Sequence, residues 1–416
     1  MVGQSLKPSA GADGAVYCDV ILKDGTIGIA DYSFYSVMGT DVSTMTGMFL
    51  TSLSGLKDVK YIGRSAFYGC LSLMTVELND TITEIGDFAF YQCINLSTVH
   101  FPEALETIGR SAFYNCGFTA LDLSGCPNLK TIGKYAFFGC YDLAEINLGN
   151  TVETIDDFAF YQSAVENLTI PDSVKTIGLR SFYMNQKLKS LTLGKNLEKI
   201  GGYAFSTCSA LEAIVLPDSV KTVENNAFYN CTAVKTLDLG KVQTIGKYAF
   251  FGLENLESLE IPGTVKFIGG YAFKGAGYLR EAKQAVITYV LLNVDAQVDA
   301  HAFYGIKGAT FYMTAAAKPD NWAARWNSSY RPVVWGCTVK SDEHGEYVFA
   351  VTVNEGTFEN PNAKDGFTAP QREGYVFDGW ATEENGAVVY TLETFVNADM
   401  GTTLYAVWTP APLANA

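Results

Sequence analysis

The residues of this chain that could carry chemistry are nine cysteines, three histidines and many carboxylates. An odd number of cysteines, taken alone, suggests thiol chemistry. Six of them share one position, three residues after a recurring phenylalanine: Cys70, Cys93, Cys116, Cys140, Cys208 and Cys231. Ser163, Asn185 and Leu253 take the same place in other copies, so the position does not require a thiol. No pair has the CxxC spacing of a zinc site. We predict a structural role for these cysteines.

The histidines leave two interpretations open. His100 occupies the outward strand position that Glu77 and Asp122 occupy in the adjacent repeats. A histidine stacked between two carboxylates favours the imidazolium and could coordinate a metal, whereas the alternative, which we favour, is a solvated polar column. His301 takes the place of a tyrosine in other repeats, and His344 lies in a charged connecting stretch. No nucleophile, base and orienting acid occur together, and GxGxxG, GxxxxGK[ST] and HExxH are absent. We predict a protein without enzymatic activity, metal or cofactor.

An aromatic side chain follows the recurring phenylalanine in most copies. The column consists of Tyr68, Tyr91, Tyr114, Phe138, Tyr161, Tyr183, Tyr229, Phe251 and Tyr304. Such a column could stack sugars or grip a protein partner. The alternative, which we favour, is aromatic packing along the edge of the coil.

The elements that must position these residues follow from the period of the sequence. The recurring phenylalanine, called the marker here, is found at Phe67, Phe90, Phe113, Phe137, Phe160, Phe182, Phe205, Phe228, Phe250, Phe273 and Phe303. The markers are 22 to 24 residues apart, except for a last interval of 30. A period of this length with leucines at fixed places, as in LMTVEL and LAEINL, is typical of a leucine-rich repeat solenoid. We predict about 11 repeats.

Each repeat is predicted to contain two strands and a closing segment. Period-two alternation at the end of the leucine pattern places Val76 and Leu78 inside and Thr75 and Glu77 in solvent. Copies stacked in register would form one parallel sheet over an apolar interior. The prolines Pro171, Pro217 and Pro262 are predicted to follow this strand directly, where a missing N–H costs little. A second, shorter strand follows, and the Ala-Phe segment after it is predicted to be a short helix or a turn.

Composition limits the classes of partner. The chain carries 29 Lys and Arg against 44 Asp and Glu, a formal net charge of -15, which opposes nucleic acid and anionic lipid. No apolar run reaches the roughly 18 residues that span a bilayer. The longest, AVITYVLLNV at 285–294, is predicted to be a core strand. The first residues lack the apolar segment of a signal peptide, and the last lack an apolar anchor.

The repeat motif IGxxAFxxCxxLxxLxLPxxV resembles the BspA-type leucine-rich repeat of bacterial surface proteins, over residues 51–312. The resemblance implies an extracellular or cell-surface location. Residues 16–50, with YSFY at 32–35, are predicted to form the N-terminal cap, preceded by a polar leader at 1–15. Residues 313–337 resemble the closing segment that follows such repeats. Its three tryptophans are predicted to cover the last coil: Trp322, Trp326 and Trp335.

A second module is predicted at 338–410, followed by a tail at 411–416. After Cys337 the period disappears, and YVFAVTV, GYVFDGWATEENG and TTLYAVW indicate short strands separated by turn residues. The stretch REGYVFDGW…TTLYAVWT resembles the Listeria-Bacteroides repeat, the B-repeat of internalins, which implies a small β-grasp-like fold. By resemblance, such a module would be a spacer or a contact point.

The predicted function is adhesion to an extracellular protein or glycan through the outward sheet face. The candidate ligand-binding residues are Glu77, His100, Asp122, Glu145, Asn147, Asn167, Thr169, Ser190, Thr192, Asp238 and Glu260. Carboxylates at both ends of the face, with hydroxyls between, suit hydrogen bonding to such a ligand. The alternatives are a glycan-binding or glycan-cleaving surface protein, suggested by the tyrosines and carboxylates, and a spacer without a site.

Overall fold

The computed structural model describes residues 5–10, 16–22, 25–35, 50–54, 56–278, 287–290, 296–306, 311–313, 318–328, 333–334, 338–341, 347–352, 375–383, 386–389 and 403–410. The chain divides into two compact units, Met1–Leu211 and Glu212–Ala416. Each unit is described by itself.

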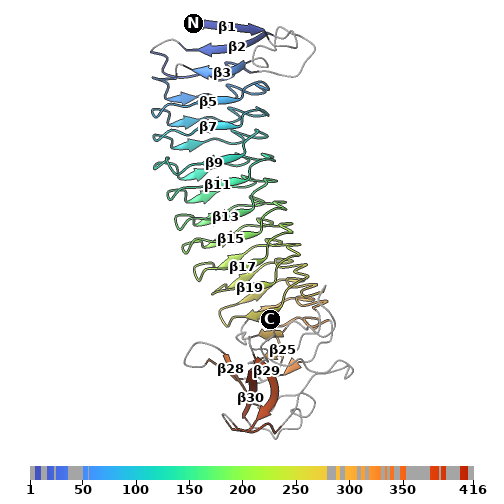
Figure 1. Cartoon of the computed structure of the whole chain (residues 1–416). Coiled ribbons are helices and arrows are strands. Elements are labelled where there is room, and N and C mark those ends of the chain that lie inside the picture. Colours follow the sequence, from blue (N-terminus) through green and yellow to red (C-terminus); the bar gives the residue numbers. More distant parts are fainter. Residues whose placement is uncertain are drawn as a thin grey trace. The chain divides into compact units, whose positions relative to one another are not determined.

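The first unit is a β-solenoid in which every coil contributes two short strands. The strands of the leucine pattern are β3 (Leu50–Ser54), β5 (Thr75–Glu77), β7 (Thr98–His100), β9 (Ala120–Asp122), β11 (Glu145–Asn147), β13 (Asn167–Thr169) and β15 (Ser190–Thr192). The second strands are β4 (Tyr61–Ile62), β6 (Glu84–Ile85), β8 (Thr107–Ile108), β10 (Thr131–Ile132), β12 (Thr154–Ile155), β14 (Thr176–Ile177) and β16 (Lys199–Ile200). In Figure 1 the strands β5 to β15 follow one another coil by coil. The solenoid prediction is confirmed.

The two strand types form different sheets. The second strands pair in parallel and in register without interruption, in the order β4-β6-β8-β10-β12-β14-β16. The leucine-pattern strands also pair in register, but they fall into separate groups: β3-β5-β7, β9-β11 and β13-β15. The prediction of one continuous sheet from the leucine pattern is therefore wrong. The continuous parallel sheet is formed by the second strands, which are two residues long.

The sheet that contains β3 also includes residues from the predicted leader and cap. Strand β1 (Ser5–Ala10) pairs antiparallel with β2 (Val16–Ile21), which pairs in parallel with β3. Phe34, in the predicted cap, stacks on Phe67 with ring centroids 5.1 Å apart. Phe34 therefore extends the aromatic interior of the coils in the N-terminal direction.

The core follows the predicted alternation. Val76 and Leu78 are buried, whereas Thr75 and Glu77 are exposed. The marker phenylalanines Phe67 to Phe205 are fully buried and stack from coil to coil, with centroids 5.1 to 5.4 Å apart. Aromatic contacts of this kind add stability beyond the burial of apolar area. The core is thus continuous along the axis of the unit.

The Ala-Phe segment is a turn, and the described residues contain no helix, so the helical alternative is wrong. Two left-handed residues flank each marker, as in Tyr135 with φ of 59° and Gly139 with φ of 70°. A right-handed helix cannot pass through two such residues. The marker Phe137 lies between these two residues, and its N–H donates to the Ala159 carbonyl of the next coil at 2.8 Å. The turn is therefore held by a backbone hydrogen bond to the neighbouring coil, not by bonds within a helix.

The second unit repeats this pattern. Its leucine-pattern strands and their continuations are β17 (Ala213–Val215), β19 (Thr236–Asp238), β21 (Ser258–Ile261), β23 (Ile287–Val290), β25 (Phe311–Met313) and β26 (Val333–Val334). Its second strands are β18 (Thr222–Val223), β20 (Thr244–Ile245), β22 (Phe267–Ile268) and β24 (Gln297–Val298). Phe228, Phe250, Phe273 and Phe303 stack at 5.4 to 5.6 Å. Strand β23 lies in the apolar run 285–294.

The predicted C-terminal closing segment packs tryptophans on the last coil. Trp322 and Trp326 are buried and meet edge to face, and the Trp326 ring lies 6.1 Å from Phe303 and 5.4 Å from Phe311. Trp335 lies outside the described residues. Trp322 and Trp326 therefore continue the aromatic core of this unit.

The prolines lie close to where they were predicted. Pro262 directly follows β21. Pro171 and Pro217 are each separated from the preceding strand by one residue. These residues, Ile170 and Leu216, are buried in the core.

The C-terminal module contains an antiparallel sheet of order β27-β28-β30-β29. Its strands are β27 (Thr338–Ser341), β28 (Tyr347–Thr352), β29 (Tyr375–Ala381) and β30 (Thr403–Pro410). Trp380, from the motif GYVFDGW, is fully buried. Residues 353–374 lie outside the described part of the chain, so the β-grasp-like connection stays a prediction. Over all described residues, no helix has the length and hydropathy needed to cross a membrane.

Candidate ligand-binding surfaces

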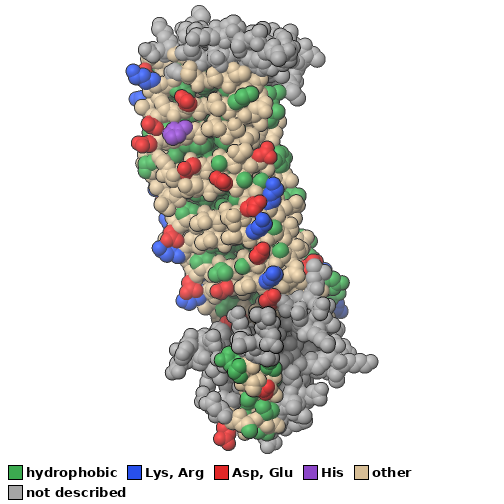
Figure 2. Space-filling view, viewed as in Figure 1, with side chains coloured by type: hydrophobic (Ala, Val, Ile, Leu, Met, Phe, Trp, Pro, Cys, Tyr) green, Lys and Arg blue, Asp and Glu red, His purple; other side chains and the backbone are tan. Residues whose placement is uncertain are grey.

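The outward side of the leucine-pattern strands carries all eleven predicted binding residues. Nine belong to strands of the first unit, and Asp238 and Glu260 belong to the second. Ten are exposed and Glu260 is half-buried. Figure 2 views this side: between β5 and β15 acidic side chains are scattered among uncharged ones, and most Lys and Arg side chains lie towards the margins. The two units each present part of the predicted face.

Three of the eleven residues already have a structural task. Asp122 accepts a hydrogen bond from the Ser124 N–H at 2.9 Å, Asn147 from the Gly149 N–H at 3.1 Å, and Asp238 from the Gly240 N–H at 2.9 Å. These are Asx turns that end the strand. The signal in the sequence is Asp or Asn followed two residues later by Ser or Gly. These side chains therefore shape the coil, and they are weaker candidates for ligand contact.

The Asx turn also affects a pKa. The backbone and hydroxyl of Ser124 hydrogen-bond the Asp122 carboxylate and, with a smaller contribution from His100, hold its pKa below the ordinary value. His100 lies directly opposite Glu77 in the pairing of β5 with β7. Among the described residues, no group of three or more His, Cys, Asp or Glu side chains could hold a metal ion. His100 and Glu77 are both exposed and lie in register on neighbouring strands.

The remaining histidines fall elsewhere. His301 stacks on Tyr271 at 5.0 Å, as its place in the repeat suggested, and its Nδ1 lies 2.8 Å from the Ser328 hydroxyl. His344 lies outside the described residues.

An uncharged patch lies on β13 and β15, the last two leucine-pattern strands of the first unit. Asn167 lies opposite Ser190 and Thr169 opposite Thr192 in the pairing of β13 with β15. All four are exposed, and none hydrogen-bonds through its side chain to another part of the described chain. Amides and hydroxyls both donate and accept hydrogen bonds. We call these four residues the hydroxyl patch.

The tyrosine column is packed differently from a sugar-stacking site. In the first unit the rings from Tyr68 to Tyr183 lie face to face, with centroids 4.3 to 5.2 Å apart and planes within 19°. Each inner ring has both faces covered by neighbours, so only edges and hydroxyls reach solvent. Sugar stacking on these faces is therefore not available, and the packing interpretation holds for the inner members of this column.

The cysteines form an internal ladder. The Cys93 thiol donates to the Phe67 carbonyl at 3.1 Å, and the Cys140 thiol donates to the Phe113 carbonyl at 3.3 Å. Burial raises the pKa of Cys140 to about 12. A buried, protonated thiol is a poor nucleophile and a poor metal ligand. The structural role predicted for this position agrees with these contacts.

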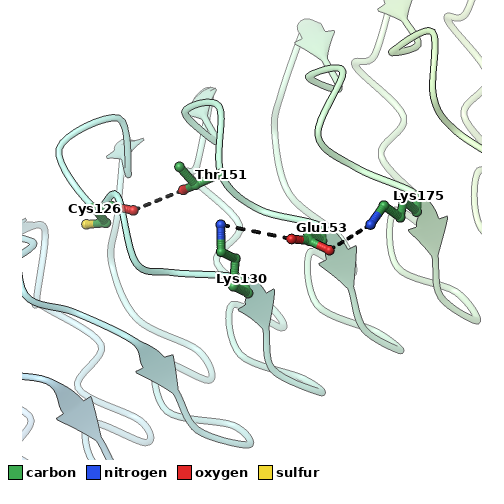
Figure 3. Close-up of polar contacts among 5 residues, drawn as sticks. All are labelled: Cys126, Lys130, Thr151, Glu153 and Lys175. Atoms are coloured by element: carbon green, nitrogen blue, oxygen red, sulfur yellow. Dashed lines mark hydrogen bonds and ion pairs between the residues drawn. The ribbon is translucent and has the colours of Figure 1, made fainter.

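Charged side chains next to the second strands form ion pairs between coils. Glu153 lies between Lys130 and Lys175, with N–O distances of 3.9 Å and 2.9 Å, as Figure 3 shows. Nearby, the Thr151 hydroxyl donates to the Cys126 carbonyl at 3.0 Å (Figure 3). The ion-paired side chains are 42% to 57% exposed, and such surface pairs contribute little to stability. The charges on this side are therefore largely paired with one another between neighbouring coils.

Comparison with known families matches both parts of the chain. The model of the BspA type leucine rich repeat region, in six copies, matches residues 60–185 and 153–280, together more than half of the chain. The model of the Listeria-Bacteroides repeat domain matches residues 340–407. Among curated proteins, none matched the sequence.

Several solved structures are similar to the chain. A leucine-rich repeat protein from Bacteroides ovatus is 21% identical, with 80% of this chain and 98% of that chain covered and a TM-score of 0.47. A leucine rich cell surface protein from Faecalibacterium prausnitzii is 19% identical, with coverages of 79% and 97% and a TM-score of 0.41. The pneumococcal vaccine antigen PcpA is 19% identical, with coverages of 76% and 94% and a TM-score of 0.32.

Proposed function

The chain belongs to the BspA-type leucine-rich repeat family, and from this premise we propose that it is a non-enzymatic binding protein of a bacterial surface, or a secreted one, that adheres to a protein ligand. The cell-surface protein named in the comparisons supports this location. The contact surface is the outward side of the leucine-pattern strands in the first unit, and the hydroxyl patch on β13 and β15 is its main contact.

The observation that carries the proposal is the state of the four side chains in that patch. They are exposed, in register on two neighbouring strands, and not used by the fold. The flanking charges of Lys189 and Glu166 are paired with each other at 3.0 Å. A ligand can therefore meet the hydroxyls without first breaking an internal hydrogen bond, which would cost about 0.5–1.5 kcal/mol each.

The test is a pair of substitutions with a matched control. Thr169→Lys with Thr192→Lys places two bulky cations in the patch, and we expect loss of binding to an immobilised extracellular-matrix extract. Thr107→Lys with Thr131→Lys makes the same change on a register pair of the second strands, and binding should stay unchanged. Both variants should melt within a few degrees of the unsubstituted protein, because all four sites are exposed. Unchanged binding by the first variant would refute the proposal.

A further inference from the structure

The arginines of the coils share one location and one type of contact. Residues 56–278 contain only three, Arg64, Arg110 and Arg180, and no lysine lies between Lys60 and Lys130. The Arg64 guanidinium lies 5.7 Å from the centre of the Phe88 ring, and Arg110 lies 5.5 Å from Tyr135. Arg180 contacts several rings and lies 4.8 Å from that of Tyr203. These are cation–π distances.

The arginines fill gaps in a second aromatic column. The position two residues before the marker is aromatic in most coils, and Tyr135 stacks there on Phe158 at 4.7 Å. Ser65 and Ser111 interrupt this column, and each is preceded by an arginine in the sequence GRSAFY. Arg180 takes the column position itself and lies 5.6 Å from Phe158. In each case a guanidinium lies over a ring where a neighbouring ring would otherwise stack.

A stacked guanidinium is a pre-organised donor. Contact with the ring restricts the side chain, and the planar guanidinium carries its N–H groups in the fork that matches a carboxylate. Arg64 and Arg110 are exposed, and among the described residues no carboxylate forms an ion pair with any of the three arginines. Asp31 and Asp87 lie close by, but they accept the backbone N–H groups of Arg64 and Arg110 at 2.8 and 2.7 Å. The side-chain forks of Arg64 and Arg110 are therefore available to a ligand, whereas Arg180 is half-buried and its Nε is buried.

The tyrosine column runs beside these arginines. Phe88 lies 5.8 Å from Tyr91, and Arg180 lies 5.7 Å from Tyr183, so both columns belong to the same turn edge. Within the described chain the hydroxyls of Tyr68, Tyr91 and Tyr114 have no hydrogen-bond partner, and burial raises the pKa of all three. They remain protonated near neutral pH and can both donate and accept.

We infer that this edge, defined by Arg64, Arg110, Arg180, Tyr68, Tyr91 and Tyr114 and called the arginine–tyrosine edge, binds an acidic polysaccharide whose sugars carry carboxylates. Carboxylates would accept from the guanidinium forks, and sugar hydroxyls would bond to the phenol row, which repeats about every 4.8 Å, once per coil. The faces of the stacked rings are covered by one another, so they are not available to an apolar anchor side chain of a protein partner.

The net charge of -15 does not oppose this inference at short range. At physiological ionic strength charges are screened over about 8 Å, so local groups decide the contact. Lys134 and Asp157 lie on the same edge and form an ion pair with an N–O distance of 2.9 Å, so their charges neutralise each other. Binding therefore depends on directional hydrogen bonds from the guanidinium groups more than on long-range electrostatic attraction by a positively charged surface.

The test measures binding of the full chain to polygalacturonate and to its methyl ester, which lacks the charge. The unsubstituted protein should bind the acid and not the ester. Arg64→Gln with Arg110→Gln should weaken binding about tenfold or more, because two charge-assisted contacts are lost. Lys57→Gln with Lys187→Gln removes the same charge from exposed positions elsewhere and should change the Kd less than about twofold.

A second variant keeps the test decisive if the arginine variant folds poorly. Tyr91→Phe with Tyr114→Phe retains the stacked rings and removes only hydroxyls, and it should weaken binding about fivefold with an unchanged melting temperature. Three outcomes would overturn the inference: no binding of the acid by the unsubstituted protein, equal weakening by the lysine and arginine variants, or equally tight, arginine-dependent binding of poly-L-glutamate. The last would assign the edge to an acidic protein segment.

Discussion

Phe160→Ala is the substitution that most directly tests the stacked core. The Phe160 ring is fully buried and stacks on Phe137 at 5.4 Å and on Phe182 at 5.2 Å. Truncation of a buried phenylalanine costs about 3–5 kcal/mol through lost burial and an unfilled cavity. Two aromatic contacts of about 0.5–1.5 kcal/mol each are lost with the ring, which places the expectation in the upper half of that range.

Tyr161→Ala provides the matched control, because the next ring along the chain is only half-buried. Water can enter the space that this truncation leaves, so we expect a loss of about 1–2 kcal/mol. Urea unfolding followed by far-ultraviolet circular dichroism measures both values. The dependence of the free energy of unfolding on urea concentration (the m value) gives further information. A smaller m value for Phe160→Ala would indicate that the coils on either side unfold separately, since each coil is stabilised mainly by its neighbours. Equal losses for the two variants would refute the assignment of the buried column.

Two further predictions concern single coils. Gly109→Ala should destabilise the protein by about 1–3 kcal/mol, because its Cβ would lie 2.6 Å from the Asp87 nitrogen, whereas Gly125→Ala meets nothing within 4 Å and should be neutral in the same urea titration. Because the pKa of Asp122 is lowered in the folded state, its contribution to stability is present above its unfolded pKa and is lost as the pH falls through the folded pKa. Asp122→Asn keeps an acceptor for the turn and removes only the charge, so the variant should melt slightly lower at pH 7, and this difference should shrink below about pH 4. A difference in melting temperature that does not change with pH would contradict the stabilisation of the ionised carboxylate.

The binding residues show where sequence reasoning reached its limit. Alternation along one strand correctly placed Thr169 and Thr192 on the outside, because that inference needs only the period of a strand. It did not separate them from Asp122, whose carboxylate is used by a turn two residues later. Sequence alternation also did not identify Arg64 and Arg110, although GRSAFY is present twice. The aromatic rings that these arginines contact belong to the following coil.

Coils of 22 to 24 residues with a phenylalanine core can be predicted from the sequence, because the period and the alternation are local patterns that are present in every repeat. The sequence does not predict which strand forms the uninterrupted sheet, that left-handed residues flank the marker in the Ala-Phe turn, or which ring faces are covered. Those outcomes depend on the distance between stacked coils, and residues 22 or more positions apart set that distance together.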